Sequence, residues 1–348
     1  MTAFLYGSSQ LELDTQMTSG TGSFVFIPRL AHFCWIGPRL PWAYGIALLS
    51  AAARGSVDDV ILHHTDDLED GPVLDALRAS PAIRISKIDP QALLNTVGRE
   101  LGIGGELNSI YCRISSPAIL SDILRAAILY REGGVYLDVD TVTVAPYPFL
   151  TEIRQFIGVE HIVWPYWVKS SISPIIWGRT LALDVMRKAM RLAPEGWRLF
   201  RIFEGLYYRG INGAIMGGEP KAPLFEIYLR YMATLPTDKQ SKPNALGPDL
   251  LQALVEEGKI QNLVVYGPEY FYPFAPEISE HWFRSCRDAP VALSAALKPK
   301  TVVVHWYGSV RTKYYVDQIC PRYIREHKKT QLYSALVAEV LPGLLLDK

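Results

Sequence analysis

Short apolar runs and longer amphipathic stretches alternate along the first hundred residues of the chain. The apolar runs predict three buried strands, at 29–37, 59–65 and 82–88. The segments that follow them have the length and spacing of helices, at 41–55, 72–80 and 91–101. This order predicts an α/β fold with a mostly parallel, doubly wound sheet and helices on both faces. Ligands of such sheets bind beyond the carboxyl ends of the strands, so we expect a site near the loops after Ile36, Thr65 and Ile88.

Residues 115–144 form the most informative segment. Ser116 and Pro117 are typical of a helix start, and Gly133-Gly134 is typical of a helix end. The helix between them is almost entirely apolar, which predicts burial. An extended segment, VYLDVD, follows over 135–140.

Polar side chains alternate with apolar ones along that extended segment, at Tyr136, Asp138 and Asp140. Two carboxylates at the mouth of a strand suit Mg²⁺ or Mn²⁺, which take oxygen ligands and fill their shell with water and substrate phosphates. A D-x-D pattern is weak by itself. Its position directly after an apolar helix, a Gly-Gly stop and a hydrophobic strand strengthens the prediction.

Asp122 and Arg125 are the polar exceptions in the apolar helix. They are three residues apart and therefore share one face. The pair is either an intrahelical ion pair at the edge of the core or a ligand-binding pair, and the helix alone leaves both interpretations open.

Composition restricts the class of protein. The chain has 348 residues, of which 49% are hydrophobic, so a large core can form and disorder of the whole chain is excluded. Thirty-five Lys and Arg balance 35 Asp and Glu, and this zero net charge argues against a general nucleic-acid binder. The length is compatible with two domains, but we expect one enlarged catalytic domain at 23–315, after a flexible leader at 1–22 and before a helical extension at 316–348.

Cysteine usage and targeting signals favour a cytoplasmic protein. The four cysteines are far apart and form no C-x-x-C pair, which excludes a disulfide framework or a zinc knuckle. No basic residue precedes Arg29, so a secretory signal is not predicted. The apolar run 40–53 is shorter than the ~20 residues that span a bilayer. A peripheral position at the inner membrane surface remains compatible with the sequence.

Three patches of sequence resemble a known enzyme family. SDILRAAILYREGGVYLDVD (121–140) is similar to the DXD-containing sugar-binding region of a glycosyltransferase group. That group includes initiating α-1,6-mannosyltransferases, α-1,4-galactosyl- and N-acetylglucosaminyltransferases, bacterial capsular and lipopolysaccharide transferases, and the catalytic domains of clostridial glucosylating toxins. IPRLAHFCWIG (27–37) resembles the opening strand of the group, and VVVHWYGSV (302–310) resembles its late His-x-Trp-x-x-Ser element.

The resemblance implies a GT-A-type catalytic domain that uses a nucleotide-sugar donor and Mn²⁺ or Mg²⁺, with Asp138, Asp140 and Arg125 as catalytic residues. Asp140 would bind the metal directly. Asp138 would contact the donor or reach the metal through water. Asp122 and Arg125 would bind donor sugar hydroxyls, because the planar Arg fork suits paired oxygens.

Other candidate residues have a functional and a structural interpretation. Trp35 would stack on the nucleobase, or is a core aromatic. Tyr136 would contact the donor, or packs in the core. Asn212, in the glycine-rich GINGAIMGG segment, would face a sugar. His305 follows an apolar run and would bind the metal, or is a structural histidine.

We therefore expect a retaining hexosyltransferase of polysaccharide biosynthesis that acts on a glycan or glycolipid acceptor, with a UDP-sugar favoured over GDP-mannose as donor. Two aromatic-rich segments, 164–177 and 266–274, are candidates for the acceptor side. Two alternatives stay open. One is a haloacid-dehalogenase-like phosphohydrolase that uses Asp138 and Asp140, and the other is a non-catalytic carbohydrate-binding relative.

Overall fold

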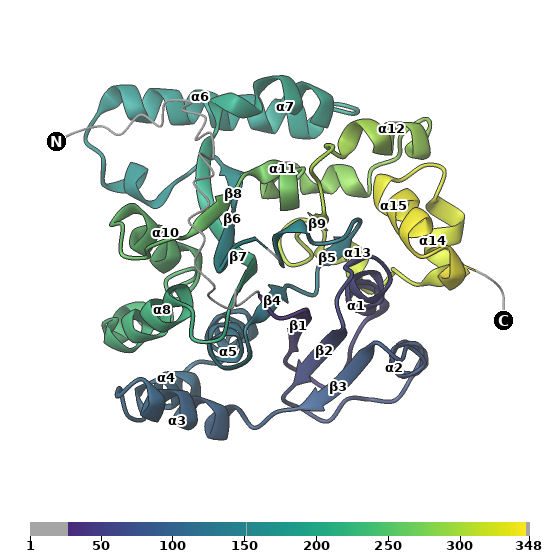
Figure 1. Cartoon of the computed structure of the whole chain (residues 1–348). Helices are drawn as coiled ribbons and strands as arrows, with labels where there is room; N and C mark the ends of the chain where they lie inside the picture. The colour runs from purple at the N-terminus through teal and green to yellow at the C-terminus, as the bar shows by residue number, and fades with distance from the viewer. Residues whose placement is uncertain (1–26, 151, 346–348) are drawn as a thin grey trace, which may run out of the picture.

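The computed structural model of the protein describes residues 27–150 and 152–345, and the leader expected at 1–22 lies outside this range. The described residues contain a seven-stranded sheet in the order β3-β2-β1-β4-β7-β6-β8 (Figure 1). Its strands are β1 (Leu30–Trp35), β2 (Asp59–His64), β3 (Ile83–Lys87), β4 (Gly134–Leu137), β6 (Gln155–Ile162), β7 (Tyr208–Gly218) and β8 (Val264–Tyr266). A two-stranded sheet pairs β5 (Thr141–Thr143) with β9 (Val303–His305).

Most neighbouring strands of the large sheet are parallel. β3, β2, β1 and β4 run in one direction, β7 runs antiparallel to both β4 and β6, and β8 is parallel to β6. The helices that connect the first strands are α1 (Trp42–Arg54) and α2 (Pro72–Arg78), and α3 follows at Pro90–Glu100. The expected α/β fold with a mostly parallel sheet is confirmed.

Helices cover both faces of the sheet. One face is covered by α3, α4 (Glu106–Arg113), α5 (Pro117–Glu132), α8 (Pro223–Thr234) and α10 (Pro248–Glu256). The other is covered by α1, α2 and α11 (Pro268–Phe271). α5 is apolar on nearly all sides because it packs against the sheet, α3 and α8 together. The charged residues Asp122 and Arg125 of α5 are therefore buried too.

The C-terminal half builds a second region of core beside the sheet (Figure 1). Its elements include α6 (Pro174–Leu192), α7 (Trp197–Phe203), α12 (Ala289–Ala296), α14 (Pro321–His327) and α15 (Leu332–Val340). Short elements complete the description: α9 (Thr237–Gln240), α13 (Lys313–Val316), and the 3-10 turns η1 (Pro148–Leu150), η2 (Tyr166–Ser170), η3 (Glu204–Leu206), η4 (Pro276–Trp282) and η5 (Pro342–Leu345). Trp282, Trp306 and Tyr333 are fully buried at its centre. α15 also contacts α1, which joins this region to the sheet.

The segment expected to be extended through Asp140 ends earlier, at Leu137. The Asp138 N–H still donates to the Ala214 carbonyl of β7 at 2.8 Å, but the chain then turns. It turns because Thr141–Thr143 pairs with β9 instead of continuing in the large sheet. The two aspartates therefore lie in a turn that joins the two sheets.

The described residues agree with two of the negative expectations. Cys34, Cys112, Cys286 and Cys320 are free thiols. In the part of the chain that the structure covers, every helix is too short or too polar to cross a bilayer.

Candidate metal and sugar-binding site

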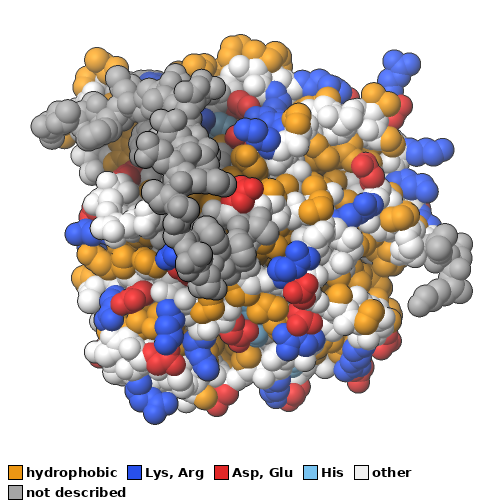
Figure 2. Space-filling view, viewed as in Figure 1, with side chains coloured by type: hydrophobic (Ala, Val, Ile, Leu, Met, Phe, Trp, Pro, Cys, Tyr) orange, Lys and Arg blue, Asp and Glu red, His pale blue; other side chains and the backbone are white. Residues whose placement is uncertain are grey.

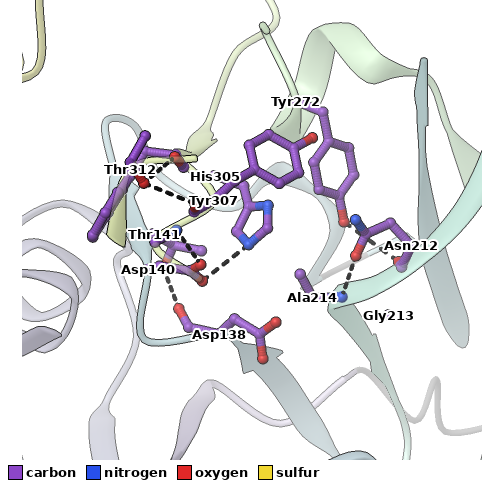
Figure 3. A network of polar contacts seen from close by, with 12 residues as sticks. Asp138, Asp140, Thr141, Asn212, Gly213, Ala214, Tyr272, His305, Tyr307 and Thr312 are labelled. Carbon is purple, nitrogen blue, oxygen red and sulfur yellow. Dashed lines mark hydrogen bonds and ion pairs between the residues drawn. The ribbon is translucent and has the colours of Figure 1, made fainter. Parts of the chain in front are cut away.

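The turn after β4 and the end of β9 bring three potential metal ligands together. Asp138, Asp140 and His305 each offer one ligand atom, and these atoms all lie within 4.8 Å of one another. Figure 3 shows the Asp140 and His305 side chains pointing toward each other, with His305 Nε2 2.9 Å from Asp140 Oδ1. The pairing of Thr141 with His305 across the small sheet fixes this arrangement.

Asp140 is held as a buried carboxylate. Its Oδ2 accepts the Gly308 N–H at 2.7 Å, and its backbone carbonyl accepts the Trp306 N–H at 3.1 Å. Burial opposes ionisation, but the His305 ring and the hydrogen bonds from His305 and Gly308 hold the pKa of Asp140 below its usual value. Burial acts against the His305 cation, yet the adjacent Asp140 carboxylate raises the pKa of His305. Asp140 thus stays ionised beside the His305 ring.

Arg125 of α5 joins the aspartate turn to the helix. Its Nη2 lies 3.2 Å from Asp122 Oδ1 and 3.2 Å from Asp138 Oδ1, and its Nη1 donates to the Gly213 carbonyl of β7 at 2.7 Å. Asp122 and Arg125 do form an ion pair, and this pair faces the candidate site. Burial raises the pKa of Asp122 to about 6, even though Arg125 opposes the shift.

Tyr136 is buried and belongs to the same network. Its Oη donates to Asp138 Oδ1 at 2.9 Å and lies 3.0 Å from Ser121 Oγ. The Arg125 guanidinium carbon lies 4.7 Å from the centre of the Tyr136 ring. Burial is the main cause that raises the pKa of Asp138. Tyr136 thus positions Asp138 and also packs in the core.

A cleft of about 390 Å³ opens over these residues. Asp122, Arg125, Asp138, Asp140 and His305 line it together, and Asn212 lines it from β7. Asn212 Oδ1 accepts the Ala214 N–H at 2.8 Å (Figure 3), and the Asn212 side chain also hydrogen-bonds to the Glu160 carboxylate. Residues 164–167, which begin the first of the two aromatic-rich segments, also line the cleft.

The donor set fits a divalent cation of the Mn²⁺ class. Two carboxylates and one imidazole are suitable ligands for Mn²⁺, whereas Mg²⁺ prefers oxygen ligands alone. His305 Nδ1 is buried and has no hydrogen-bond partner among the described residues. The protein therefore uses only one ring nitrogen of the buried His305, Nε2, which contacts Asp140. The unpaired Nδ1 is compatible with a ligand role for this residue.

Trp35 lies apart from this group. It ends β1, and its ring centre lies 5.1 Å from that of Tyr44. It is half-buried and does not line the described cleft. The loops after Ile36, Thr65 and Ile88 do not line the cleft either. Its described walls come mainly from α5, the turn after β4, β6, η2, β7, α10 and β9.

Several residues at the site were not predicted from the sequence. Glu160 of β6 lines the cleft, and its Oε2 accepts the Tyr307 Oη hydrogen bond at 2.6 Å. Gly247 precedes α10, and a Cβ built there would lie 2.5 Å from Asp122 Oδ2. The only sequence signal for Glu160 is an acidic residue inside an apolar run. For Gly247 the signal is a Gly-Pro pair at a helix start.

Comparison with known proteins finds a family match over part of the chain. Residues 62–157 match the family described as glycosyltransferase sugar-binding region containing DXD motif. No protein of curated function matches the chain. Similar solved structures include the PaToxG glycosyltransferase, which has 17% identity and a TM-score of 0.42, and the match covers 67% of this chain and 70% of that chain.

Two further solved structures are similar to this chain. The UDP-bound glycosyltransferase domain from the YGT toxin has 11% identity and a TM-score of 0.37, with coverage of 70% of this chain and 80% of that chain. The WbbM bifunctional glycosyltransferase has 12% identity and a TM-score of 0.44, and the match covers 91% of this chain and 52% of that chain.

Proposed function

We propose, from the membership of residues 62–157 in the DXD-containing glycosyltransferase family, that the protein is a metal-dependent, retaining glycosyltransferase. It moves a hexose from a nucleotide-sugar donor to a hydroxyl group of a glycan or glycolipid. A UDP-sugar is favoured and GDP-mannose is the alternative donor. The supporting observation is the convergence of Asp138, Asp140 and His305 beside the Arg125 network in one cleft.

Asp140, Asp138 and His305 would hold the metal. When bound, Mn²⁺ or Mg²⁺ supplies positive charge that stabilises the departing nucleoside diphosphate. The protein's own contribution is to keep Asp140 ionised, through His305 and the Gly308 N–H. This matters because the chain has zero net charge and offers no general positive field for a diphosphate.

Arg125 and Asp122 would orient the donor sugar. The guanidinium is already fixed by Asp138 and the Gly213 carbonyl, so little side-chain freedom is lost when a sugar hydroxyl binds. Asn212 would offer its amide nitrogen to a sugar of the donor or the acceptor. Trp164 and Trp167 at the cleft would contact the apolar face of the acceptor sugar. Trp35 would stack on the base.

Retention of anomeric configuration would follow from front-face substitution. Asp138, Asp140 and Glu160 at the centre of the cleft are each held by a hydrogen-bond partner, so none is a free carboxylate poised for covalent attack. The leaving phosphate would instead guide the acceptor hydroxyl. The phosphohydrolase alternative needs a later acidic pair, whereas the group around Asp138 and Asp140 is completed by His305.

Residues 23–315 would form the catalytic domain and 316–348 an extension that packs on it. This division is supported by β9, which carries His305 to the aspartates, and by the contact of α15 with α1. We place the enzyme in the cytoplasm.

The test measures thermal stability and sugar transfer with a panel of nucleotide sugars, each with and without Mn²⁺. One donor should raise the melting temperature more than the others, and only when the metal is present. Asp140→Asn should lose metal-dependent transfer. The control is Asp317→Asn, which changes an exposed aspartate outside the cleft and should keep transfer. Unchanged turnover in Asp140→Asn would show that the metal assignment is wrong.

A further inference from the structure

Exposed apolar side chains are concentrated on one part of the surface. Of the fifteen large hydrophobic residues that are exposed in the described part of the chain, ten fall between 166 and 206. These ten are Tyr166, Ile172, Ile175, Leu181, Val185, Leu192, Leu199, Ile202, Phe203 and Leu206. They belong to η2, α6, α7, η3 and the connection between η2 and α6. We name this set the η2–α7 surface.

α6 carries large apolar residues on both its inward and its outward side. Its inward side buries Leu183 and Met190 together with the charged residues Asp184 and Arg187. Its outward side carries Ile175, Val185 and Leu192. The buried charges are paired, because Arg187 contacts both Asp184 and Glu277 of η4. A helix in water normally places its apolar side against the core and its charges outside. The outward side of α6 therefore suits an apolar environment.

Positive charge frames this surface. Residues 164–209 contain eight Lys or Arg against three Asp or Glu, a net charge of +5 in a chain whose total is zero. Lys169, Arg179, Lys188 and Arg198 are exposed among the apolar residues. Figure 1 shows α6 and α7 end to end along one edge of the molecule, and Figure 2 shows hydrophobic side chains gathered along that edge with basic ones beside them.

This combination fits an anionic lipid bilayer better than a protein partner. Helices that lie in a bilayer interface carry aliphatic and aromatic residues on one side and Lys or Arg around them. Each basic residue near an anionic surface contributes attraction that salt screens. Protein interfaces are instead enriched in aromatic residues, Met and Arg and depleted in Lys, whereas eight of the ten exposed apolar residues here are Ile, Leu or Val.

The η2–α7 surface is continuous with the cleft. Tyr166 is 44% exposed on this surface and also lines the cleft, together with Trp167. Tyr166 Oη donates to Glu256 Oε2 of α10 at 2.8 Å, which fixes its position at the rim. A bilayer seated on this surface would therefore lie beside the cleft mouth, and aromatic residues at such a boundary are typical of the lipid–water interface.

We propose that the η2–α7 surface docks the protein on the surface of an anionic membrane, with α6 and α7 lying in the plane of the interface. α6 does not cross the bilayer, because charged residues recur along its 19 residues. The proposal stands on exposure and charge and does not depend on the reaction that the cleft carries out.

The experiment is cosedimentation of the full chain with vesicles of phosphatidylcholine, alone or mixed with phosphatidylglycerol. The wild-type protein should bind the mixed vesicles, bind the neutral vesicles at least about tenfold more weakly, and lose binding as salt rises. Ile175→Glu combined with Val185→Glu should lower binding to mixed vesicles at least about tenfold, because two charges would then enter the interface. The matched control is Val291→Glu in α12, since Val291 is 67% exposed and Val185 is 66% exposed.

A second pair of variants tests the charges without changing the apolar residues. Lys169→Glu with Arg198→Glu should weaken binding, whereas Lys313→Glu with Arg322→Glu should not. Melting temperatures report whether each variant folds. Equal binding of the wild type and both test variants overturns the proposal. A second result would also overturn it: the wild type self-associates, the Ile175/Val185 variant does not, and neither protein binds vesicles. In that case this surface is a contact between copies of the chain.

Discussion

Arg125 and Asp138 meet between a helix and the turn that follows a strand, with Arg125 Nη2 3.2 Å from Asp138 Oδ1. The same nitrogen lies 3.2 Å from Asp122 Oδ1, so one guanidinium stands between a buried and a half-buried carboxylate. Removal of the cation would leave the buried Asp122 without its ion-pair partner, which costs several kcal/mol in a buried site. The geometry of the aspartate turn and the stability of the fold therefore depend on the same side chain.

The first prediction concerns the shape of this cation. Arg125→Lys keeps the charge but cannot contact Asp122, Asp138 and the Gly213 carbonyl together, because an ammonium group lacks the planar fork. We expect kcat/KM for sugar transfer to fall about 100-fold, a change typical of lost orientation. The control is Arg230→Lys, since Arg230 also contacts a carboxylate and a carbonyl but lies on α8. Similar activity in both variants would contradict the assigned role of Arg125.

A second prediction uses Gly247. Gly247→Ala would place a Cβ 2.5 Å from Asp122 Oδ2 and displace that carboxylate. We expect the donor KM to rise about tenfold, an effect of the size seen when a positioning contact is lost. Gly105→Ala, where the nearest atom would be 4.0 Å away, should leave the kinetics unchanged.

Metal affinity provides a third prediction. His305→Gln removes the imidazole next to Asp140, so Mn²⁺ affinity should fall at least about tenfold in a calorimetric titration. The protein should remain folded, because glutamine can still donate to Asp140. His327→Gln in α14, whose ring contacts only the Tyr323 carbonyl and ring, should bind Mn²⁺ like the wild type. Equal affinities in all three proteins would remove His305 from the ligand set.

The fourth prediction is an acid-dependent loss of stability that involves His161. Burial, and to a smaller extent Lys298 and Arg209, lowers the pKa of this ring from 6.5 to about 4. Between these two values the unfolded chain binds a proton that the folded chain does not, so the free energy of unfolding falls as pH decreases. The expected loss at pH 5 is on the order of 1–2 kcal/mol.

Asp122 acts in the opposite direction, because its pKa is raised to about 6 by burial and the folded chain takes up its proton first. The measurement is therefore a comparison of wild type with His161→Gln by urea unfolding at pH 7 and at pH 5. The variant should lose less stability on acidification than the wild type. Parallel losses in the two proteins would show that His161 is protonated equally in the folded and unfolded states.

The sequence by itself determined the local elements and one half of the candidate site. Apolar periodicity and Gly or Pro punctuation placed β1 to β3 and the helices after them within one or two residues, because these signals act over a single turn or strand. The helix spacing of Asp122 and Arg125, and the D-x-D pattern of Asp138 and Asp140, placed four charged residues on neighbouring elements. The end of the strand at Leu137 was missed, since it depends on pairing with β9.

Only the tertiary structure decided how distant parts of the chain meet. His305 is 165 residues from Asp140 and reaches it through the antiparallel pairing of β9 with β5. Gly247 and Glu160 enter the site from elements whose sequences carry no clear chemical signal. The apolar side of α6 was equally hidden, because periodicity shows that a helix is amphipathic but not which side faces the protein. In the folded protein Leu183 and Met190 pack in the core, and ion pairs with Asp184 and Glu277 hold Arg187 on the same inward side.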